Sequence, residues 1–347
     1  MKKRVLIAVS GGVDSSVACH LLKKKGYQVI AATIKTWPKK ECGAYGSKLC
    51  CSLDAISSAR SICGKLGVPH YVFDFSKEFR NKIILLCERD YKKGRTPNPC
   101  VLCNSEIKFG LLLKKADELA CDYLSSGHYA NVVCKEHKYY LKKGKDRDKD
   151  QSYFLFNLSQ HQLSRILFPL GRMKKDEVRA LAKKVGLKSH DRASSQDLCF
   201  GRDGGEELVG DIMFRGVKRM GKHKGISHYT VGQRKGLGVA FSEPLYVTHI
   251  DALNNALHVG TIKDSYKEAF IADCLHWING SFSQRRIHAK AKIRYGSKEV
   301  NACIQPLSRN TARVTFEKPQ FSPTPGQAVV FYKKDTVLGG GWIKDVL

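Results

Sequence analysis

Residues 5–15 read Val-Leu-Ile-Ala-Val-Ser-Gly-Gly-Val-Asp-Ser and decide how the chain begins to fold. The apolar first half predicts a buried strand, and the spacing of apolar residues after Ser15 predicts a helix. Between them, Gly11 and Gly12 permit positive φ angles and a close approach of the backbone to a ligand. Successive N–H groups in such a loop and at a helix start favour an anion such as pyrophosphate. No Gly-Lys-Ser or Gly-Lys-Thr follows, so this is not the loop that holds a transferred γ-phosphate. The alternative is an ordinary glycine turn.

The first half of the chain alternates strand and helix patterns. Further strands are expected at residues 29–33, 68–75 and 122–126, and helices at residues 55–66, 104–120, 160–167 and 174–185. Repeated strand–helix units predict an α/β fold with a doubly wound parallel sheet, whose ligand lies at the carboxyl ends of the strands. Ser10 and Gly127 would both lie on that edge.

The pattern changes beyond the glycine-rich segment at residues 201–205, which we interpret as a linker. Short alternating strands are expected at residues 287–295, 302–306, 311–316 and 328–332, which predicts a small β-barrel. The expected domains are residues 1–203 for the parallel sheet, 204–272 for a small central domain and 273–347 for the C-terminal barrel.

The charge of the chain points to a polyanionic partner. Its 347 residues carry a formal net charge of +28. Nucleic acid is the first candidate for such an excess, although a general bias of the source toward basic proteins would also produce it. The basic N-terminus precedes only five apolar residues (5–9), too few for a signal peptide, whose apolar region needs about 7–15. No stretch has the length of a membrane span, and we expect a cytoplasmic protein.

The chain has 13 cysteines, which in a cytosolic protein indicate thiol chemistry, metal binding or packing. Cys19, Cys63 and Cys87 fall in expected helices and are interpreted as packing. Cys100 and Cys103 form a Cys-x-x-Cys pair at the start of a helix, where a lowered thiol pKa would favour the reactive thiolate. A catalytic thiol, half of a metal or iron–sulfur site and inert packing all remain open for this pair.

A second candidate thiol is Cys199, in Ser194-Ser195-Gln196-Asp197-Leu198-Cys199-Phe200-Gly201. Its polar and glycine neighbours favour a loop over a buried position. Cys50 and Cys51, or Cys199, could also complete the ligand set of a metal or cluster at the Cys-x-x-Cys pair.

Several segments together resemble one family, the tRNA-specific 2-thiouridylases of the MnmA type. The Ser-Gly-Gly-x-Asp-Ser loop resembles the PP-loop of ATP pyrophosphatases, which leave AMP on a substrate and release pyrophosphate. The other matching segments are residues 50–52, 96–104, 126–129, 149–153, 199–200, 230–238, 294–295 and 325–327. The resemblance spans nearly the whole chain.

The resemblance implies ATP- and Mg²⁺-dependent 2-thiolation of the wobble uridine of tRNA. ATP would adenylate the C2 oxygen of the uridine, so that AMP becomes the leaving group. Cys199 would carry a persulfide supplied by a cysteine desulfurase or a sulfur-relay protein, and its terminal sulfur, or released sulfide, would attack C2. Cys103 would then resolve the persulfide and form a disulfide with Cys199. The acceptor tRNAs would be those for Lys, Glu and Gln.

The resemblance also assigns binding residues. Asp14 would be a direct or indirect partner of Mg²⁺. The ATP-binding residues would be Ala8, Val9, Ser10, Gly11, Gly12, Val13, Asp14, Ser15, Ile34 and Gly127. The target base would contact Asn98, Pro99 and Cys100, the tRNA would contact Lys149, Asp150, Gln151, Arg294 and Tyr295, and His128 and Gln327 would help to select it.

Three other functions compete with this interpretation. The first is another PP-loop adenylating enzyme, such as an amidotransferase-type synthetase or a lysidine-type tRNA ligase, which would use an amine nucleophile. The second is a basic RNA-binding protein with a vestigial loop. The third is a thiolase in which Cys103 and Cys199 hold an iron–sulfur cluster instead of a persulfide.

Overall fold

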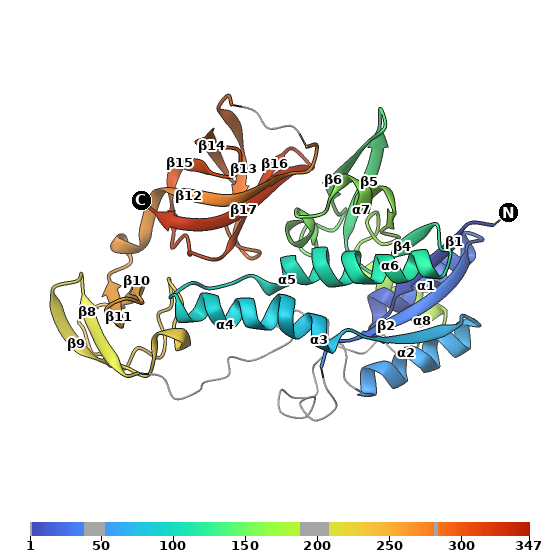
Figure 1. Cartoon of the computed structure of the whole chain (residues 1–347), viewed down its shortest axis with the longest axis horizontal. Coiled ribbons are helices and arrows are strands. Elements are labelled where there is room, and N and C mark those ends of the chain that lie inside the picture. Colours follow the sequence, from blue (N-terminus) through green and yellow to red (C-terminus); the bar gives the residue numbers. More distant parts are fainter. Residues whose placement is uncertain (1, 38–52, 188–207, 281–283) are drawn as a thin grey trace. The chain divides into compact units, whose positions relative to one another are not determined.

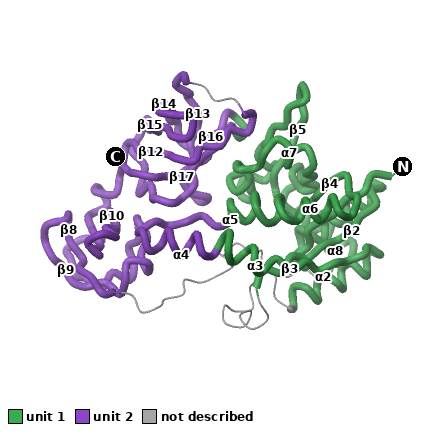
Figure 2. Tube along the Cα trace, viewed as in Figure 1, with its two compact units in different colours: residues 1–83, 100–201, 334–337 green, residues 84–99, 202–333, 338–347 purple. Residues whose placement is uncertain are grey.

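The fold was analysed in a computed structural model, which describes residues 2–37, 53–187, 208–280 and 284–347. The chain divides into two compact units, coloured separately in Figure 2. Unit 1 contains residues 1–83, 100–201 and 334–337, and unit 2 contains residues 84–99, 202–333 and 338–347.

Unit 1 is built on a parallel sheet with the strand order β3-β2-β1-β4-β7 (Figure 1). Its strands are β1 (Arg4–Ala8), β2 (Gln28–Lys35), β3 (His70–Asp74), β4 (Tyr123–Ser125) and β7 (Ile166–Leu167). Since β1 pairs with β2 on one side and β4 on the other, the strand order reverses at β1. Ligands of doubly wound sheets bind at such a point. The predicted α/β fold with a parallel sheet is therefore confirmed.

Three helices pack around this sheet: α1 (Val13–Lys24), α2 (Leu53–Leu66) and α8 (Lys175–Lys184). Apolar side chains of these helices, among them Val17, Ala59 and Val178, form one buried cluster with β1 and β2. The cluster holds the start of α1 rigidly beside the carboxyl end of β1. Gly26, at φ +85°, follows the C-cap Lys25 and ends α1 as a C′ glycine.

A second helical run begins earlier than predicted, at Pro99 rather than residue 104. It continues through α5 (Pro99–Leu102), the π-helical segment η2 (Cys103–Leu111) and α6 (Leu112–Glu118). Proline fits the first helical position because the N–H that it lacks would have no partner there. The start at Pro99 places Cys100 in the first turn of the run and Cys103 one turn further along.

Two other predictions for unit 1 were incomplete. The helix predicted over residues 160–167 ends as α7 (Gln160–Ser164), and the apolar pair that follows is β7, in register with Leu124 and Ser125 of β4. The charged segment after residue 129 contains a hairpin, β5 (Ala130–Lys135) and β6 (Lys138–Lys143), that was not predicted. Strand β7 depends on its pairing with β4, which local patterns do not reveal, whereas β5 and β6 pair with each other.

Unit 2 contains two β structures. A four-stranded sheet has the order β10-β11-β8-β9 and buries a core that includes Ile212, Val247 and Leu257. A closed antiparallel barrel has the order β12-β15-β14-β13-β16-β17, with β12 also pairing with β17. Their bounds are β8 (Gly210–Phe214), β9 (Lys218–His223), β10 (Tyr246–Asp251), β11 (Ala256–Gly260), β12 (Tyr266–Trp277), β13 (Ile287–Lys292), β14 (Val300–Pro306), β15 (Ala312–Phe321), β16 (Ala328–Lys333) and β17 (Thr336–Val346). The predicted barrel is confirmed.

Glycine explains why β17 was missed. A Cβ at Gly339 would lie 2.1 Å from the carbonyl oxygen of His276, and one at Gly341 would lie 2.6 Å from that of Asp273. Both oxygens belong to β12, so these glycines allow the two strands that close the barrel to approach. In a sequence, a run of glycines weakens a strand prediction.

Unit 2 also includes a short part of the N-terminal half of the sequence. Helix α4 (Leu85–Lys92) and residues 93–99 belong to unit 2. A Cβ at Gly94, which has φ +69°, would lie 2.8 Å from Ile250 of β10, and the N–H of Thr96 donates to Pro325 at 2.8 Å. The predicted domain bounds did not include this excursion and stay a prediction. None of the described helices is both long and apolar enough to span a membrane.

Candidate functional site

The loop between β1 and α1 presents backbone N–H groups at the carboxyl edge of the parallel sheet. Gly12 is the N-cap of α1 and supplies no side-chain cap. The N–H groups of residues 11–15 make no hydrogen bond within the part of the chain that the structure describes. Such N–H groups at a helix start, together with the helix dipole, are suited to a phosphate group.

Serine hydroxyls shape the loop from inside. Ser15 Oγ accepts the backbone N–H of Ser10 at 3.2 Å and donates to the carbonyl of Gly12 at 3.2 Å. Ser16 Oγ donates to the same carbonyl at 2.7 Å. The serine hydroxyls therefore stabilise the conformation of the loop, so that its backbone N–H groups are held in fixed orientations.

Two glycines allow neighbouring segments to approach the loop closely. Gly11 has φ +70°, and a Cβ on it would lie 2.6 Å from the carbonyl oxygen of Ala55 in α2. A Cβ on Gly127, just beyond β4, would lie 2.7 Å from the N atom of Ser15. The structure thus brings Gly127 and the loop together. Ile34 lies near the carboxyl end of β2 and is partly exposed, as an apolar contact for a base would be.

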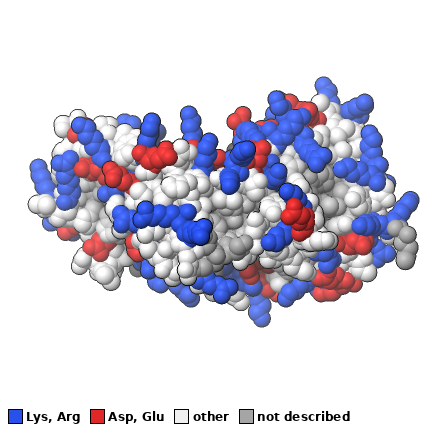
Figure 3. Space-filling view, turned by 90° about the horizontal axis from the view of Figure 1, so that it is seen from above, with Lys and Arg blue, Asp and Glu red and all other residues white. Residues whose placement is uncertain are grey.

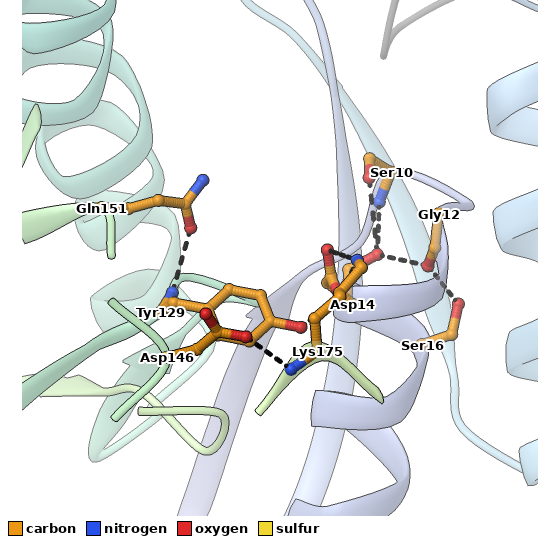
Figure 4. A network of polar contacts seen from close by, with 9 residues as sticks. Ser10, Gly12, Asp14, Ser16, Tyr129, Asp146, Gln151 and Lys175 are labelled. Carbon is orange, nitrogen blue, oxygen red and sulfur yellow. Dashed lines mark hydrogen bonds and ion pairs between the residues drawn. The ribbon is translucent and has the colours of Figure 1, made fainter. Parts of the chain in front are cut away.

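The carboxylate of Asp14, in the first turn of α1, already has two partners (Figure 4). Lys175 Nζ lies 2.6 Å from both of its oxygens, and the Tyr129 hydroxyl donates to Oδ1 at 2.7 Å. Burial and the Asp14 carboxylate raise the pKa of Tyr129, so its hydroxyl stays protonated and donates. Gln151 Oε1 accepts the N–H of Tyr129 at 3.0 Å and holds this residue in place.

The acidic side chains at the loop determine whether the protein itself would hold the expected Mg²⁺ ion. Among the described residues, no group of three or more His, Cys, Asp or Glu side chains is arranged to hold a metal ion. Asp14 is the acidic residue of the loop, and its oxygens accept from Lys175 and Tyr129. This arrangement fits an Mg²⁺ ion that is held mainly by nucleotide phosphates and water, as Mg²⁺ in such sites usually is.

The Cys-x-x-Cys pair lies on the helical run that starts at Pro99. Asn98 and Pro99 are buried, and Cys100 and Cys103 are partly buried. Burial raises the pKa of the Cys100 thiol, and the positive charge of Lys108 opposes this only in part. The prediction that the helix start gives a reactive thiolate is therefore wrong for Cys100, because its desolvation outweighs the favourable charge. Cys199 lies outside the described residues, as do Cys50 and Cys51.

The cysteines interpreted as packing are buried as predicted. Cys19 lies in α1, Cys63 in α2 and Cys87 in α4, each 0–2% exposed. Burial raises the pKa of Cys19 to about 12 and that of Cys63 to about 11. Thiols of this kind are protonated and unreactive near neutral pH.

Gln327 fixes the backbone of residues 96–97, just before the helical run. Its Nε2 donates to the carbonyl oxygens of Thr96 and Pro97, at 3.0 and 3.1 Å. Gly326, with φ +89°, lies so near that a Cβ would be 2.9 Å from the Thr96 oxygen. This positioning of the segment before Asn98 was not predicted, because more than 200 residues separate the partners. Its proposed part in tRNA selection stays a prediction.

We expect Gln327→Ala to lower the free energy of unfolding by about 1–3 kcal/mol, because two partly buried carbonyl oxygens lose their donor. Thiolation of tRNA would fall, while ATP binding to the loop of unit 1 would be unchanged. Chemical unfolding and calorimetric ATP titration measure the two effects. Gln320→Ala is the control, since Gln320 is partly exposed and its side-chain amide donates to the nearby carbonyl oxygens of Lys318 and Pro319. Equal losses in both variants would contradict the assignment.

His128 packs against two aromatic rings. The centroids of Phe109 and Phe168 lie 5.7 and 5.8 Å from its ring, and Ser126 Oγ lies 2.7 Å from Nδ1. Burial, with a smaller contribution from Lys108, lowers the pKa of His128 well below 6.5. The imidazole is therefore neutral near physiological pH. Its assigned role in tRNA selection stays a prediction.

This pKa shift makes stability depend on pH. The unfolded chain binds a proton at His128 near its ordinary pKa, and the folded chain does so only at lower pH. Stability is therefore full above about pH 7 and falls below the unfolded pKa, by up to ~1.4 kcal/mol per pH unit. We expect His128→Gln to flatten the fall in melting temperature between pH 7.5 and 5.5. His161→Gln, at an exposed position in α7, is the control; identical profiles for the two variants would refute the assignment.

The residues expected to contact tRNA differ in exposure. Asp150 is 6% exposed, and its carboxylate accepts the N–H groups of Gly144 and Ser152. Gln151 supports Tyr129, as described above. Lys149 is partly exposed. A direct RNA contact by Asp150 stays a prediction, and its buried carboxylate also gives it a structural role.

Two more of these residues lie just after β13 in unit 2. Arg294 donates from Nη2 to the carbonyl oxygens of Phe321 and Ser322. Tyr295 has the ammonium of Lys292 5.3 Å from its ring centroid. Lys and Arg side chains spread over the face seen in Figure 3, with smaller groups of acidic side chains between them. Such a surface is suited to a phosphate backbone.

The fold and the site define a nucleotide-binding protein of the PP-loop class. Family descriptions match consecutive parts of the chain: "tRNA methyl transferase HUP domain" at residues 3–203, "tRNA methyl transferase PRC-barrel domain" at 205–261 and "Aminomethyltransferase beta-barrel domain" at 267–343. The chain belongs to the tRNA-specific 2-thiouridylase family.

Membership rests on relatives that match over their full length. The chain is 47% identical to tRNA-specific 2-thiouridylase MnmA 2 of Thermoanaerobacter sp. (strain X514), over 99% of this chain and 98% of that protein. It is 48% identical to tRNA-specific 2-thiouridylase MnmA of Geotalea uraniireducens (strain Rf4), over 99% and 95%. For the enzyme of that name from Halothermothrix orenii, identity is 44% over 99% of each chain.

Proposed function

We propose that this protein catalyses the ATP-dependent 2-thiolation of the wobble uridine of tRNA. The observation that carries the proposal is the loop of residues 10–15 at the reversal point of the sheet, in which the N–H groups of residues 11–15 have no partner among the described residues and Gly127 packs against Ser15. This geometry suits a pyrophosphate group, and the full-length relatives are named tRNA-specific 2-thiouridylases.

The first chemical step is adenylation of the substrate. The C2 oxygen of the uridine attacks the α-phosphate of ATP, pyrophosphate leaves, and the oxygen becomes part of an AMP leaving group. The ATP-binding residues are those of the loop, residues 8–15, with Ile34 and Gly127. The amides of the loop stabilise the pyrophosphate as its negative charge develops. Mg²⁺ neutralises phosphate charge when bound with ATP.

The second step transfers sulfur. The terminal sulfur of a Cys199 persulfide, or sulfide released from it, attacks C2, and AMP leaves. When the persulfide itself attacks C2, the outer sulfur links Cys199 Sγ to C2, and Cys103 then attacks Cys199 Sγ, so that the S–S bond breaks, the outer sulfur stays on C2 and a Cys103–Cys199 disulfide forms. When sulfide attacks C2, Cys103 has released it beforehand by the same attack on Cys199 Sγ. A thiol reductant must reopen the disulfide for another turnover. The sulfur comes from a cysteine desulfurase or a relay protein. Support comes from the position of Cys103, which is partly buried one turn into the helical run that begins at Pro99, next to the proposed target-base residues Asn98, Pro99 and Cys100.

The RNA partner accounts for the charge. A net charge of +28 suits a folded RNA with many phosphates, and the proposed acceptors are the tRNAs for Lys, Glu and Gln. Lys149, Asp150, Gln151, Arg294 and Tyr295 are the proposed contacts, with His128 and Gln327 as selecting residues. We further propose a cytoplasmic location, where these tRNAs are found.

The test is nucleoside mass spectrometry of tRNA after incubation with the protein, Mg²⁺, ATP and a persulfide source. The expected result is 2-thiouridine at the wobble position, with one AMP and one pyrophosphate formed for each uridine converted. Absence of 2-thiouridine would refute the proposal. Methylated nucleoside formed with S-adenosylmethionine would instead favour the activity that the family descriptions name.

Iron and sulfide assays on protein purified without oxygen distinguish the persulfide relay from the alternative that requires an iron–sulfur cluster. We expect full thiolation by protein that contains no iron. A cluster that turnover requires would overturn the persulfide relay, while formation of AMP without any sulfur transfer would favour another adenylating enzyme.

A further inference from the structure

Lys175 is a buried cation that takes no part in the proposed reaction steps. Only 6% of the residue is exposed, although lysine is almost never buried without a partner. It lies at the first position of α8, and its ammonium lies 2.6 Å from each carboxylate oxygen of Asp14 in α1. The two residues are 161 positions apart in the sequence, so this pair exists only in the folded protein.

The surroundings of the pair hold it in one geometry. The backbone N–H of Lys175 donates to Asp146 Oδ2 at 2.8 Å, which fixes the start of α8. The Tyr129 hydroxyl donates to the Asp14 carboxylate from a second direction, and the ammonium lies 5.7 Å from the centroid of the Tyr129 ring (Figure 4). Both oxygens of Asp14 are thus directed to fixed donors.

The position of Asp14 gives this arrangement a consequence for ligand binding. Asp14 lies within the loop that we propose to bind the phosphates of ATP, and 28% of its side chain is exposed. An uncompensated carboxylate there would repel a phosphate anion, and the low dielectric near a protein interior strengthens such repulsion. A buried ammonium in contact with both oxygens cancels that charge.

We propose that Lys175 is a positioning residue that fixes and neutralises Asp14, so that the loop accepts the phosphates of a nucleotide. In this role Asp14 is a charge held by Lys175 and is not a direct ligand of Mg²⁺. The inference rests on the proposed function, because it assumes that the loop binds ATP.

The test compares Lys175→Met, Asp14→Asn, the double variant and Lys184→Met, a control that removes an exposed lysine from the same helix. The dissociation constant of α,β-methylene-ATP with Mg²⁺ is measured by calorimetry, without tRNA. We expect Lys175→Met to bind roughly tenfold more weakly, since Asp14 then keeps an unpaired charge. The double variant, which carries neither charge, should recover most of this loss, and Lys184→Met should bind as the wild type does.

The double variant makes the inference falsifiable. If Lys175 touched the nucleotide itself, or if Asp14 bound Mg²⁺ directly, the double variant would bind no better than Lys175→Met, and either result would overturn the proposal. Wild-type affinity in Lys175→Met would overturn it too. Melting temperatures identify variants that fail to fold, and the double variant should fold well because replacing both partners of a buried pair with neutral groups is well tolerated. If the wild type itself bound no nucleotide, the proposed function would fail as well.

Discussion

Cys103→Ser should abolish 2-thiouridine formation, lowering it by about a thousandfold or more, while ATP binding stays near the wild-type level. A serine hydroxyl at this position is a poor nucleophile toward a persulfide and cannot form the disulfide that releases sulfur. Cys103 belongs to the helical run of residues 99–118 and not to the phosphate loop, so the nucleotide site should remain intact. Nucleoside mass spectrometry and calorimetric ATP titration measure the two properties separately.

Cys134→Ser is the matched control for this prediction. Cys134 is an exposed cysteine of β5, and the same chemical change there should leave thiolation unchanged. Cys199→Ser should behave as Cys103→Ser does if both thiols act in one relay. Thiolation that persists in either of these two variants would rule out the mechanism that we propose.

Gly127→Ala should weaken ATP binding by about 100-fold, because the added methyl group displaces the start of α1. The new Cβ would lie 2.7 Å from the N atom of Ser15 and 2.8 Å from the carbonyl carbon of Asp14. Both are backbone atoms of the helix that carries the phosphate loop, so no side-chain rotation can relieve the contact. The expected loss of stability from overpacking is about 1–3 kcal/mol. Calorimetric ATP titration and chemical unfolding report these changes.

The control is Gly64→Ala in α2. A Cβ at Gly64 has no neighbour within 4 Å, and the position does not have a positive φ angle. Alanine there should leave ATP binding unchanged and stabilise the helix by up to ~1 kcal/mol. If Gly127→Ala bound ATP as tightly as Gly64→Ala does, the close packing of Gly127 on the loop would not be required for binding.

Local patterns were sufficient for the parts of the fold whose stabilising contacts lie near in sequence. The strand–loop–helix unit around residues 10–15 was predicted because its apolar residues, glycines and helix start are consecutive. The burial of Cys19 and Cys63 followed from their helical spacing. The barrel was predicted from its alternating strands, but the glycine-rich strand β17 was not. Its glycines are needed because carbonyl groups of β12 approach them closely, and this contact is not visible in the sequence.

Some features of the candidate site were likewise predicted from the sequence, and others appear only in the structure. The resemblance assigned Gly127 to ATP, and the structure adds that its backbone packs on the loop at Ser15. No motif could show that Lys175 pairs with Asp14, because an isolated lysine at a helix start is usually solvated. Nor could the sequence show that Gln327 supports residues 96–97, or that burial raises the pKa of Cys100.

By itself, the sequence determined that the chain has a glycine-rich loop, suited to a phosphate group, at the edge of a parallel sheet, a C-terminal barrel and a strongly basic charge. These properties depend on residue type and on spacings of a few positions. Only the tertiary structure decided that α4 and residues 93–99 belong to unit 2, that Tyr129 and Lys175 converge on Asp14, and that Gly127 meets Ser15. Each of these depends on contacts between residues tens to hundreds of positions apart, which chain folding brings together and local periodicity does not record.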